Sequence, residues 1–77
     1  MVYYVLEFQT GENSGAVLPV AYTDRATAEA AYHTILSAAA TSNVRKHGAM
    51  LCNEDMFIIK QDIYTHYEPE PNEQDNT

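Results

Sequence analysis

The chain of 77 residues contains only one cysteine, Cys52, and no tryptophan. A single cysteine excludes an intramolecular disulfide framework and is typical of a protein in a reducing compartment. Only four side chains are basic, against eleven acidic ones, which gives a formal charge of -7. A protein that binds a nucleic-acid groove needs a basic face, so we expect no direct contact with nucleic acid.

Long apolar runs are also absent from the sequence. No stretch approaches the ~20 apolar residues that a membrane-spanning helix requires. The first residues lack the basic start and apolar middle of a secretion signal. We therefore expect no membrane insertion and a cytoplasmic location.

Motifs that carry chemistry are the third absence. His33, His47 and His66 form no pair at helical i,i+4 spacing, and Cys52 has no Cys-x-x-Cys partner, so we expect no metal site. His47 and Cys52 differ by an odd number of positions, which on one strand places them on opposite faces and argues against a nucleophile and its base. We predict that the chain is not an enzyme and needs no cofactor.

The chain is long enough for one domain, at a size where folding buries only about 60% of the unfolded surface. Composition changes after Tyr67: the last ten residues contain Glu68, Glu70, Glu73 and Asp75, with prolines between them. We predict a single domain over residues 1–67 and a flexible acidic tail over residues 68–77. The tail is either a solvated segment or a mimic of a phosphate backbone that blocks a host nucleic-acid-binding protein.

The remaining pattern predicts two hairpins and a helix. Alternating apolar residues favour strands over 2–9, 16–22, 49–52 and 56–64. Residues 26–40 are rich in alanine and lack Gly and Pro, which predicts a helix capped by Thr23 or Asp24. The order ββαββ predicts an α+β fold: a four-stranded antiparallel sheet in spatial order 2-1-3-4 with one helix packed on one face.

One helix can cover only one face of such a sheet. At 100° per residue, the helix face toward the sheet contains Ala28, Ala31, Tyr32, Ile35 and Ala39. We expect the core side of the sheet to carry Tyr4, Leu6 and Phe8, then Leu18, Val20 and Tyr22, and finally Phe57, Ile59 and Ile63.

The opposite sheet face then carries apolar side chains with no cover. We expect this face to show Tyr3, Val5, Val17, Ile58 and Tyr64. Aromatic and β-branched residues with a polar rim are typical of an interface, although single exposed apolar residues are also normal on monomers. We interpret the face as the contact of a homodimer, or of a host or phage protein partner.

A second candidate site follows the helix. Arg45, Lys46 and His47 precede Gly48, whose missing side chain would let a small anion or nucleotide approach the backbone, with Tyr64 or His66 stacking nearby. A structural alternative explains the same residues, because cations are favourable at the negative end of a helix dipole.

Four segments of the chain carry a family resemblance. They are Ala21-Tyr22-Thr23-Asp24, residues 32–40 (YHTILSAAA), His47-Gly48-Ala49-Met50-Leu51 and Tyr64-Thr65-His66. With these segments the chain resembles short uncharacterised proteins encoded by phages and prophages of gut Firmicutes. The resemblance implies a non-catalytic accessory protein in the cytoplasm of a bacterial host, and it implies no activity for any single residue.

Overall fold

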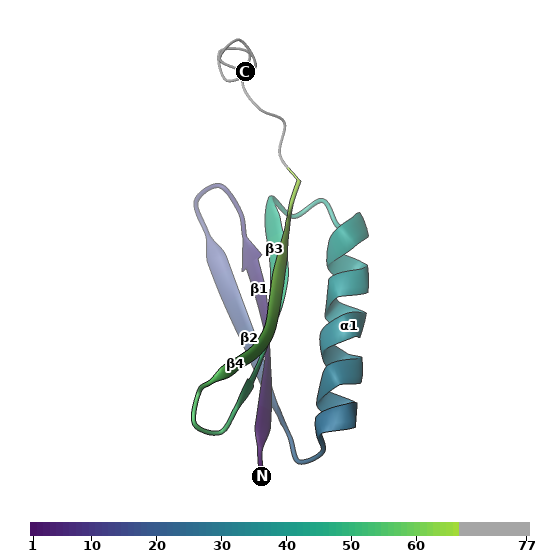
Figure 1. Cartoon of the computed structure of the whole chain (residues 1–77). Helices are drawn as coiled ribbons and strands as arrows, with labels where there is room; N and C mark the ends of the chain where they lie inside the picture. Colours follow the sequence, from purple (N-terminus) through teal and green to yellow (C-terminus); the bar gives the residue numbers. More distant parts are fainter. Residues whose placement is uncertain (67–77) are drawn as a thin grey trace, which may run out of the picture.

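The computed structural model describes residues 1–66 and contains four strands and one helix. The elements are β1 (Tyr3–Thr10), β2 (Gly15–Tyr22), α1 (Arg25–Thr41), β3 (Lys46–Asn53) and β4 (Ile58–Thr65). The strands form one antiparallel sheet in the order β2-β1-β3-β4, and α1 lies along one of its faces (Figure 1). The predicted α+β fold and strand order are therefore confirmed. The predicted tail, residues 68–77, lies outside the described residues.

Helix α1 begins at a side-chain cap. Of the two candidates, Asp24 is the cap: its Oδ2 accepts the Thr27 N–H at 2.9 Å and the Thr27 hydroxyl at 2.8 Å. These hydrogen bonds stabilise the ionised carboxylate, so they hold the pKa of Asp24 below its usual value of 3.8. At the other end, the Ser42 N–H donates to the Ala39 carbonyl at 3.3 Å.

Removal of this cap is expected to destabilise the fold in a pH-dependent way. A depressed folded-state pKa adds stability above the unfolded pKa, and that stability is lost as the pH falls through the folded-state pKa. Asp24→Ala should therefore unfold at a lower temperature than the wild type at pH 7, with the difference shrinking below about pH 4. Thermal unfolding by circular dichroism measures both values. Asp24→Asn is the control: asparagine also caps, so its loss at pH 7 should be smaller than that of Asp24→Ala, whereas both differences from the wild type should shrink alike at low pH because both variants lack the titrating group. Differences from the wild type that do not change with pH would contradict the mechanism.

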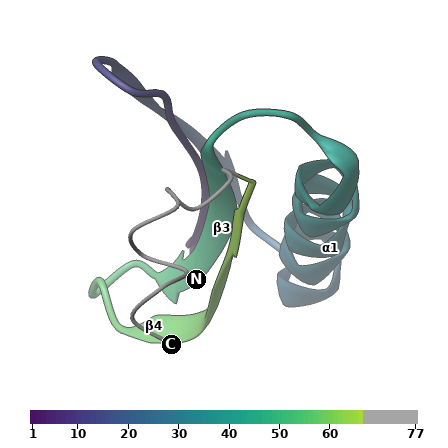
Figure 2. The ribbon, with the colours of Figure 1, turned by 90° about the horizontal axis from the view of Figure 1, so that it is seen from above.

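The core lies between α1 and the two central strands. Its buried cluster consists of Val5, Ala28, Tyr32, Ala49 and Leu51. The predicted helix face is confirmed, because Ala28, Tyr32 and Ala39 are buried while Ala31 and Ile35 pack against the cluster. Seen from above, α1 stands beside β3 on one side of the sheet (Figure 2). Small alanines let the helix approach closely, but they also make it a narrow cover.

The prediction of which β1 side chains enter this core is wrong. Val5 is 1% exposed and Tyr3 packs against the cluster, so the odd-numbered residues of β1 face the helix. The reason is the turn over residues 11–14, closed by the Gly11 N–H donating to the Ser14 carbonyl at 2.8 Å. A four-residue turn pairs odd positions of β1 with even positions of β2, and a one-residue slip would exchange the two faces completely.

The predicted β2 side chains lie on the expected side of the sheet, but two of the three are less buried than a core position requires. Leu18 and Val20 lie on the helix side of the sheet, since they pair with Glu7 and Val5. Both remain about half exposed, because α1 lies mainly over β3 and β1 and hardly reaches the edge strand. Tyr22 alone of the predicted three is partly buried against the core.

Strand β4 contains an irregularity that changes which side chains face the helix. Leu51 pairs with Lys60 while Cys52 pairs with Ile58, so Ile59 is an extra residue and the strand has a β-bulge. Ile59 packs against the core as predicted, but Ile63 lies on the opposite side and Phe57 is exposed. Their predicted core positions are therefore wrong.

A polar link joins β4 to the helix. Lys60 Nζ lies 2.8 Å from Glu29 Oε1, and Arg25 Nε lies 3.0 Å from Glu29 Oε2. Two hydrogen bonds hold the pKa of Glu29 below its usual value: the one from Lys60 has the larger effect, and the one from Arg25 adds to it. The helix-facing side of β4 thus carries the charges Lys60 and Asp62, whereas its other side, with Ile58, Gln61, Ile63 and Thr65, is uncharged.

Candidate interaction surface

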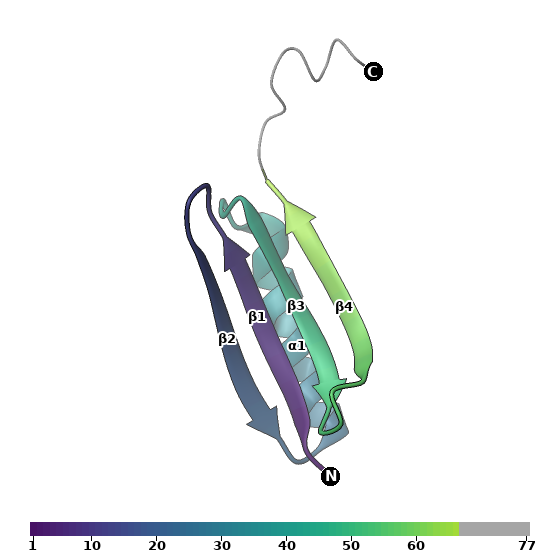
Figure 3. The same ribbon diagram turned by 90° about the vertical axis from the view of Figure 1, so that its left-hand side faces the viewer.

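The sheet face turned away from α1 is the candidate functional surface, and we call it the open face. Register places on it alternate residues of all four strands, and no element among residues 1–66 lies across it (Figure 3). Its apolar members are Tyr4, Leu6, Phe8, Val17, Pro19, Ala21, Met50, Cys52, Ile58 and Ile63.

Charge separates the two faces of the sheet. The helix side carries Glu7, Lys60 and Asp62, whereas the strand residues of the open face include a single charged side chain, Lys46, in the last row. Soluble monomers rarely expose a continuous apolar surface of this kind without a role for it. The more apolar face of the sheet is the one that the helix leaves uncovered.

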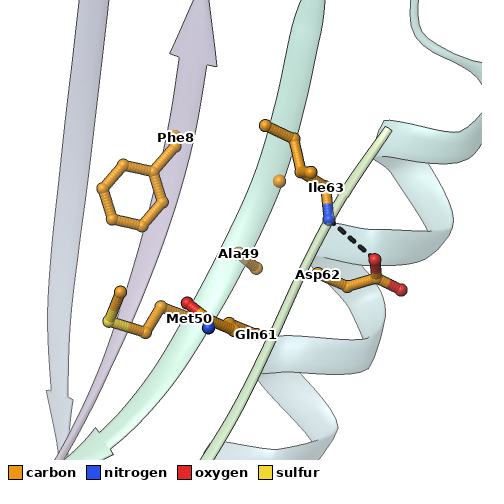
Figure 4. A pocket seen from close by; sticks show the side chains of 7 residues that line it. Phe8, Ala49, Met50, Gln61, Asp62 and Ile63 are labelled. Carbon is orange, nitrogen blue, oxygen red and sulfur yellow. Dashed lines mark hydrogen bonds between the residues drawn. The ribbon is translucent and has the colours of Figure 1, made fainter. Parts of the chain in front are cut away.

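Two shallow hollows shape the open face. One, of about 540 Å³, is lined by Tyr4, Leu6, Pro19, Met50, Cys52 and Ile58, together with Met56 and the charged Glu54 from the β3–β4 turn. The other, of about 450 Å³, has Phe8, Met50 and Ile63 on its walls (Figure 4). Met50 borders both, so the two hollows meet at the centre of the face. Such a surface has the relief that allows side chains of a partner to interdigitate.

The structure divides the five predicted interface residues between the two faces. Val17 and Ile58 lie on the open face and are half exposed. Placement of the other three there is wrong: Val5 is in the core, Tyr3 packs against it, and Tyr64 pairs with His47 on the helix side. The interface itself stays a prediction, now with a different set of residues.

The residues that sequence reasoning placed in the core instead form much of this surface. The sequence analysis places Tyr4, Leu6, Phe8 and Ile63 on the helix side of the sheet and Tyr3 and Val5 on the uncovered side. The signal that could have corrected this is the length of the first turn. Tyr22 and Val20 face the core only if their partners Tyr3 and Val5 do so too.

The predicted anion-binding residues do not converge on one site. Residues 46–48 belong to β3 and not to a loop, so Lys46 faces the open side while His47 is buried on the helix side. Gly48 is needed for a close approach, but the approaching backbone is that of β4. Arg45 lines a separate hollow of about 500 Å³ with Asn43 and Ser14.

Of the other two predicted ligand residues, His66 contacts the end of the helix and Tyr64 contacts the His66 ring. His66 Nε2 lies 2.7 Å from the Ala39 carbonyl oxygen, to which its N–H donates, and the His66 backbone N–H donates to the Arg45 carbonyl at 2.7 Å. The rings of His66 and Tyr64 stack 6.2 Å apart at an angle of 8°. These contacts satisfy carbonyl groups near the helix C-terminus, which is a structural role.

A network of hydrogen bonds between polar side chains, absent from the sequence-based predictions, lies partly buried beside this helix end. His47 Nε2 lies 2.6 Å from Glu7 Oε2, and His47 Nδ1 lies 3.0 Å from Ser42 Oγ. An ionised carboxylate only accepts, so Nε2 carries the proton, and in the neutral ring Nδ1 accepts the Ser42 hydroxyl. Ser42 Oγ in turn accepts the Val44 N–H at 3.1 Å. These hydrogen bonds connect β1, β3 and the end of α1.

The close packing at Gly48 leads to a stability prediction. A Cβ at this position would press against the Asp62 carbonyl oxygen and lie 2.9 Å from the Ile63 Cα, which are backbone atoms of β4. Gly48→Ala must therefore push β4 away, and we expect a loss of at least about 1 kcal/mol in urea unfolding. Gly15→Ala is the control, because its Cβ would meet the Gln9 carbonyl at an ordinary 3.7 Å. Equal losses for the two variants would refute this explanation.

Other kinds of site find no support in the described part of the chain. Residues 1–66 contain no group of three His, Cys, Asp or Glu side chains that could hold a metal ion. Within the same residues, no helix has the length and hydropathy needed to cross a membrane. Comparison with known protein families, with curated proteins and with solved structures finds no match for this chain. Its function is therefore argued from the geometry of its own surfaces.

Proposed function

We propose that the chain is a small, non-catalytic interaction module that acts through protein–protein contacts and works as a homodimer. The observation that carries this proposal is the open face, an apolar surface whose strand residues include one charged side chain, on a domain whose helix covers the more polar side of the sheet. A small domain gains burial from a dimer contact that its own core lacks. The resemblance to phage and prophage proteins supports an accessory role.

The homodimer is open to a direct measurement. Sedimentation velocity of the wild type at micromolar concentration is expected to give the mass of two chains. Thermal unfolding should then shift to higher temperature as the protein concentration rises, because association stabilises only the folded state. A clean monomer at these concentrations, with an unfolding temperature that does not change, would count against the dimer.

Binding of a small anion or nucleotide is the second candidate. It rests on Arg45, which borders a hollow that also contains the polar side chains of Asn43 and Ser14. Thermal shift against inorganic phosphate and a panel of nucleotides tests it, and the absence of any shift beyond noise would remove it. Mimicry of a phosphate backbone by the acidic tail is a third proposal, and its residues lie outside the described part of the chain.

A further inference from the structure

We infer that two copies of the chain pack open face against open face, which yields four layers in the order helix, sheet, sheet, helix. This inference rests on the proposed function and names the partner and the surface it uses. A homodimer of a single-sheet protein has two common routes: pairing of edge strands into a larger sheet, or packing of sheet faces. The edges and the face of this sheet differ in what they offer.

The β2 edge is blocked at its centre. Gly11 and Ser14 form a hydrogen-bonded pair, and such pairs alternate along an antiparallel ladder. Counting along the regular register, residues 16, 18, 20 and 22 bond to β1, whereas residues 15, 17, 19 and 21 turn their backbone groups outward. Pro19 is therefore one of the outward residues, and it has no N–H to donate to another strand.

The β4 edge is blocked in a different way. Asn53 donates its N–H to the Phe57 carbonyl, so odd residues of β3 bond to β4, and their partners Tyr64, Asp62 and Lys60 turn inward. Ile63 then turns its N–H outward, where it donates to Asp62 Oδ1 at 2.8 Å. This outward donor is already used, and the bulge near Ile58 also interrupts the edge.

The open face offers what the edges lack. Four strands at ~4.8 Å and eight residues at ~3.3 Å cover roughly 500 Å² in projection, so two faces bury about 1,000 Å², the size at which specific interfaces begin. Isologous contact requires a patch that fits itself, and an apolar patch with few charges meets little repulsion from its own copy. The hollows around Met50 and the protruding Met56 give this patch both concave and convex parts.

The sequence of residues 67–77 has few apolar side chains to match this face. Residues 67–77 are YEPEPNEQDNT: Tyr67 and two prolines are their only apolar side chains, beside four acidic groups. Burial of those carboxylates against Leu6 and Phe8 would cost free energy, because neither side chain can pair with a charge. A second copy of the open face carries the matching chemistry.

The chain provides matched variants for a test. Val17 and Val20 lie on the same strand and are 50% and 51% exposed, but Val17 faces the open side and Val20 the helix side. Aspartate at either position changes charge and strand propensity equally. We expect the wild type and Val20→Asp to sediment as dimers, and Val17→Asp to dissociate at least ~10-fold more readily. Ile63→Asp, on the open face at the opposite edge, should behave like Val17→Asp.

Circular dichroism establishes that each variant is folded, and binding of the apolar dye ANS separates the two levels of the proposal. A dimer that survives Val17→Asp and Ile63→Asp but not Val20→Asp overturns the open-face contact. A monomeric wild type that binds ANS, with less binding in Val17→Asp, overturns the second copy as partner and leaves the open face as a surface for another protein. A monomeric wild type that binds no ANS overturns both.

Discussion

Replacement of Leu51 by alanine is expected to remove roughly 2–5 kcal/mol of folding free energy. Leu51 is fully buried at the centre of β3, where it packs with Val5 on the sheet and with Ala28 and Tyr32 on the helix. The alanines that let α1 approach closely have no side-chain length with which to fill the resulting cavity. The loss is large beside the roughly 3–10 kcal/mol that a folded unit of this size commonly has.

Urea unfolding followed by far-UV circular dichroism measures this loss, with all proteins at the same concentration because association would add to the apparent stability. Leu18→Ala is the matched control, since Leu18 is on the helix side of the same sheet but is half exposed at the β2 edge. We expect its loss to stay below about 1 kcal/mol. Similar losses at the two leucines would mean that the core is not centred under α1.

The fold was predictable from the sequence because its signals are local. An alanine-rich segment with an aspartate before it predicts a helix, and turn residues between apolar runs predict hairpins. The spatial order then follows from the short connections, and the structure confirms it. The choice of face was not predictable in the same way, because it depends on a register that one residue in the first turn decides.

Hydrophobicity also favoured the wrong face, for a physical reason. Tyr4, Leu6 and Phe8 form the more apolar row of β1, while the other row contains Glu7 and Gln9 beside Tyr3 and Val5. In the structure Glu7 lies on the helix side, where its carboxylate accepts from His47 and from the Gln9 side chain. A hydrogen-bond network that connects three elements cannot be read from composition, since Glu7 and His47 are 40 positions apart in sequence.

The error and the proposal have a common origin. Had the apolar row of β1 faced the helix, the uncovered face would have carried Glu7 and Gln9 among its apolar side chains. Instead, the helix covers the row that contains Glu7, and the row of Leu6 and Phe8 is left open together with Met50 and Ile63. A sheet arranged in this way lowers its free energy by packing its second face against another apolar surface. The position of the apolar row of β1 on the open face thus favours association.

The Glu7–His47 contact is expected to have a large and non-additive effect on stability. The His47 side chain is 7% exposed and that of Glu7 23%, so removal of Glu7 leaves a buried ring nitrogen without its partner, and removal of His47 leaves a partly buried carboxylate with Gln9 as its remaining side-chain donor. Glu7→Ala and His47→Ala should each cost roughly 2–3 kcal/mol, because a hydrogen bond to an ionised group is lost and its other member stays desolvated. Urea unfolding of both variants gives the two values.

The double variant decides between a true interaction and two independent losses. Where the two side chains stabilise the fold through each other, Glu7→Ala/His47→Ala should cost about 1 kcal/mol less than the sum of the single losses. Ser42→Ala is the control. It removes the weaker hydrogen bond of the network, from the hydroxyl 3.0 Å from His47 Nδ1, and should cost less than either single variant. Strict additivity of the Glu7 and His47 losses would show that the contact contributes nothing. Apolar packing alone would then hold the polar row of β1 under the helix.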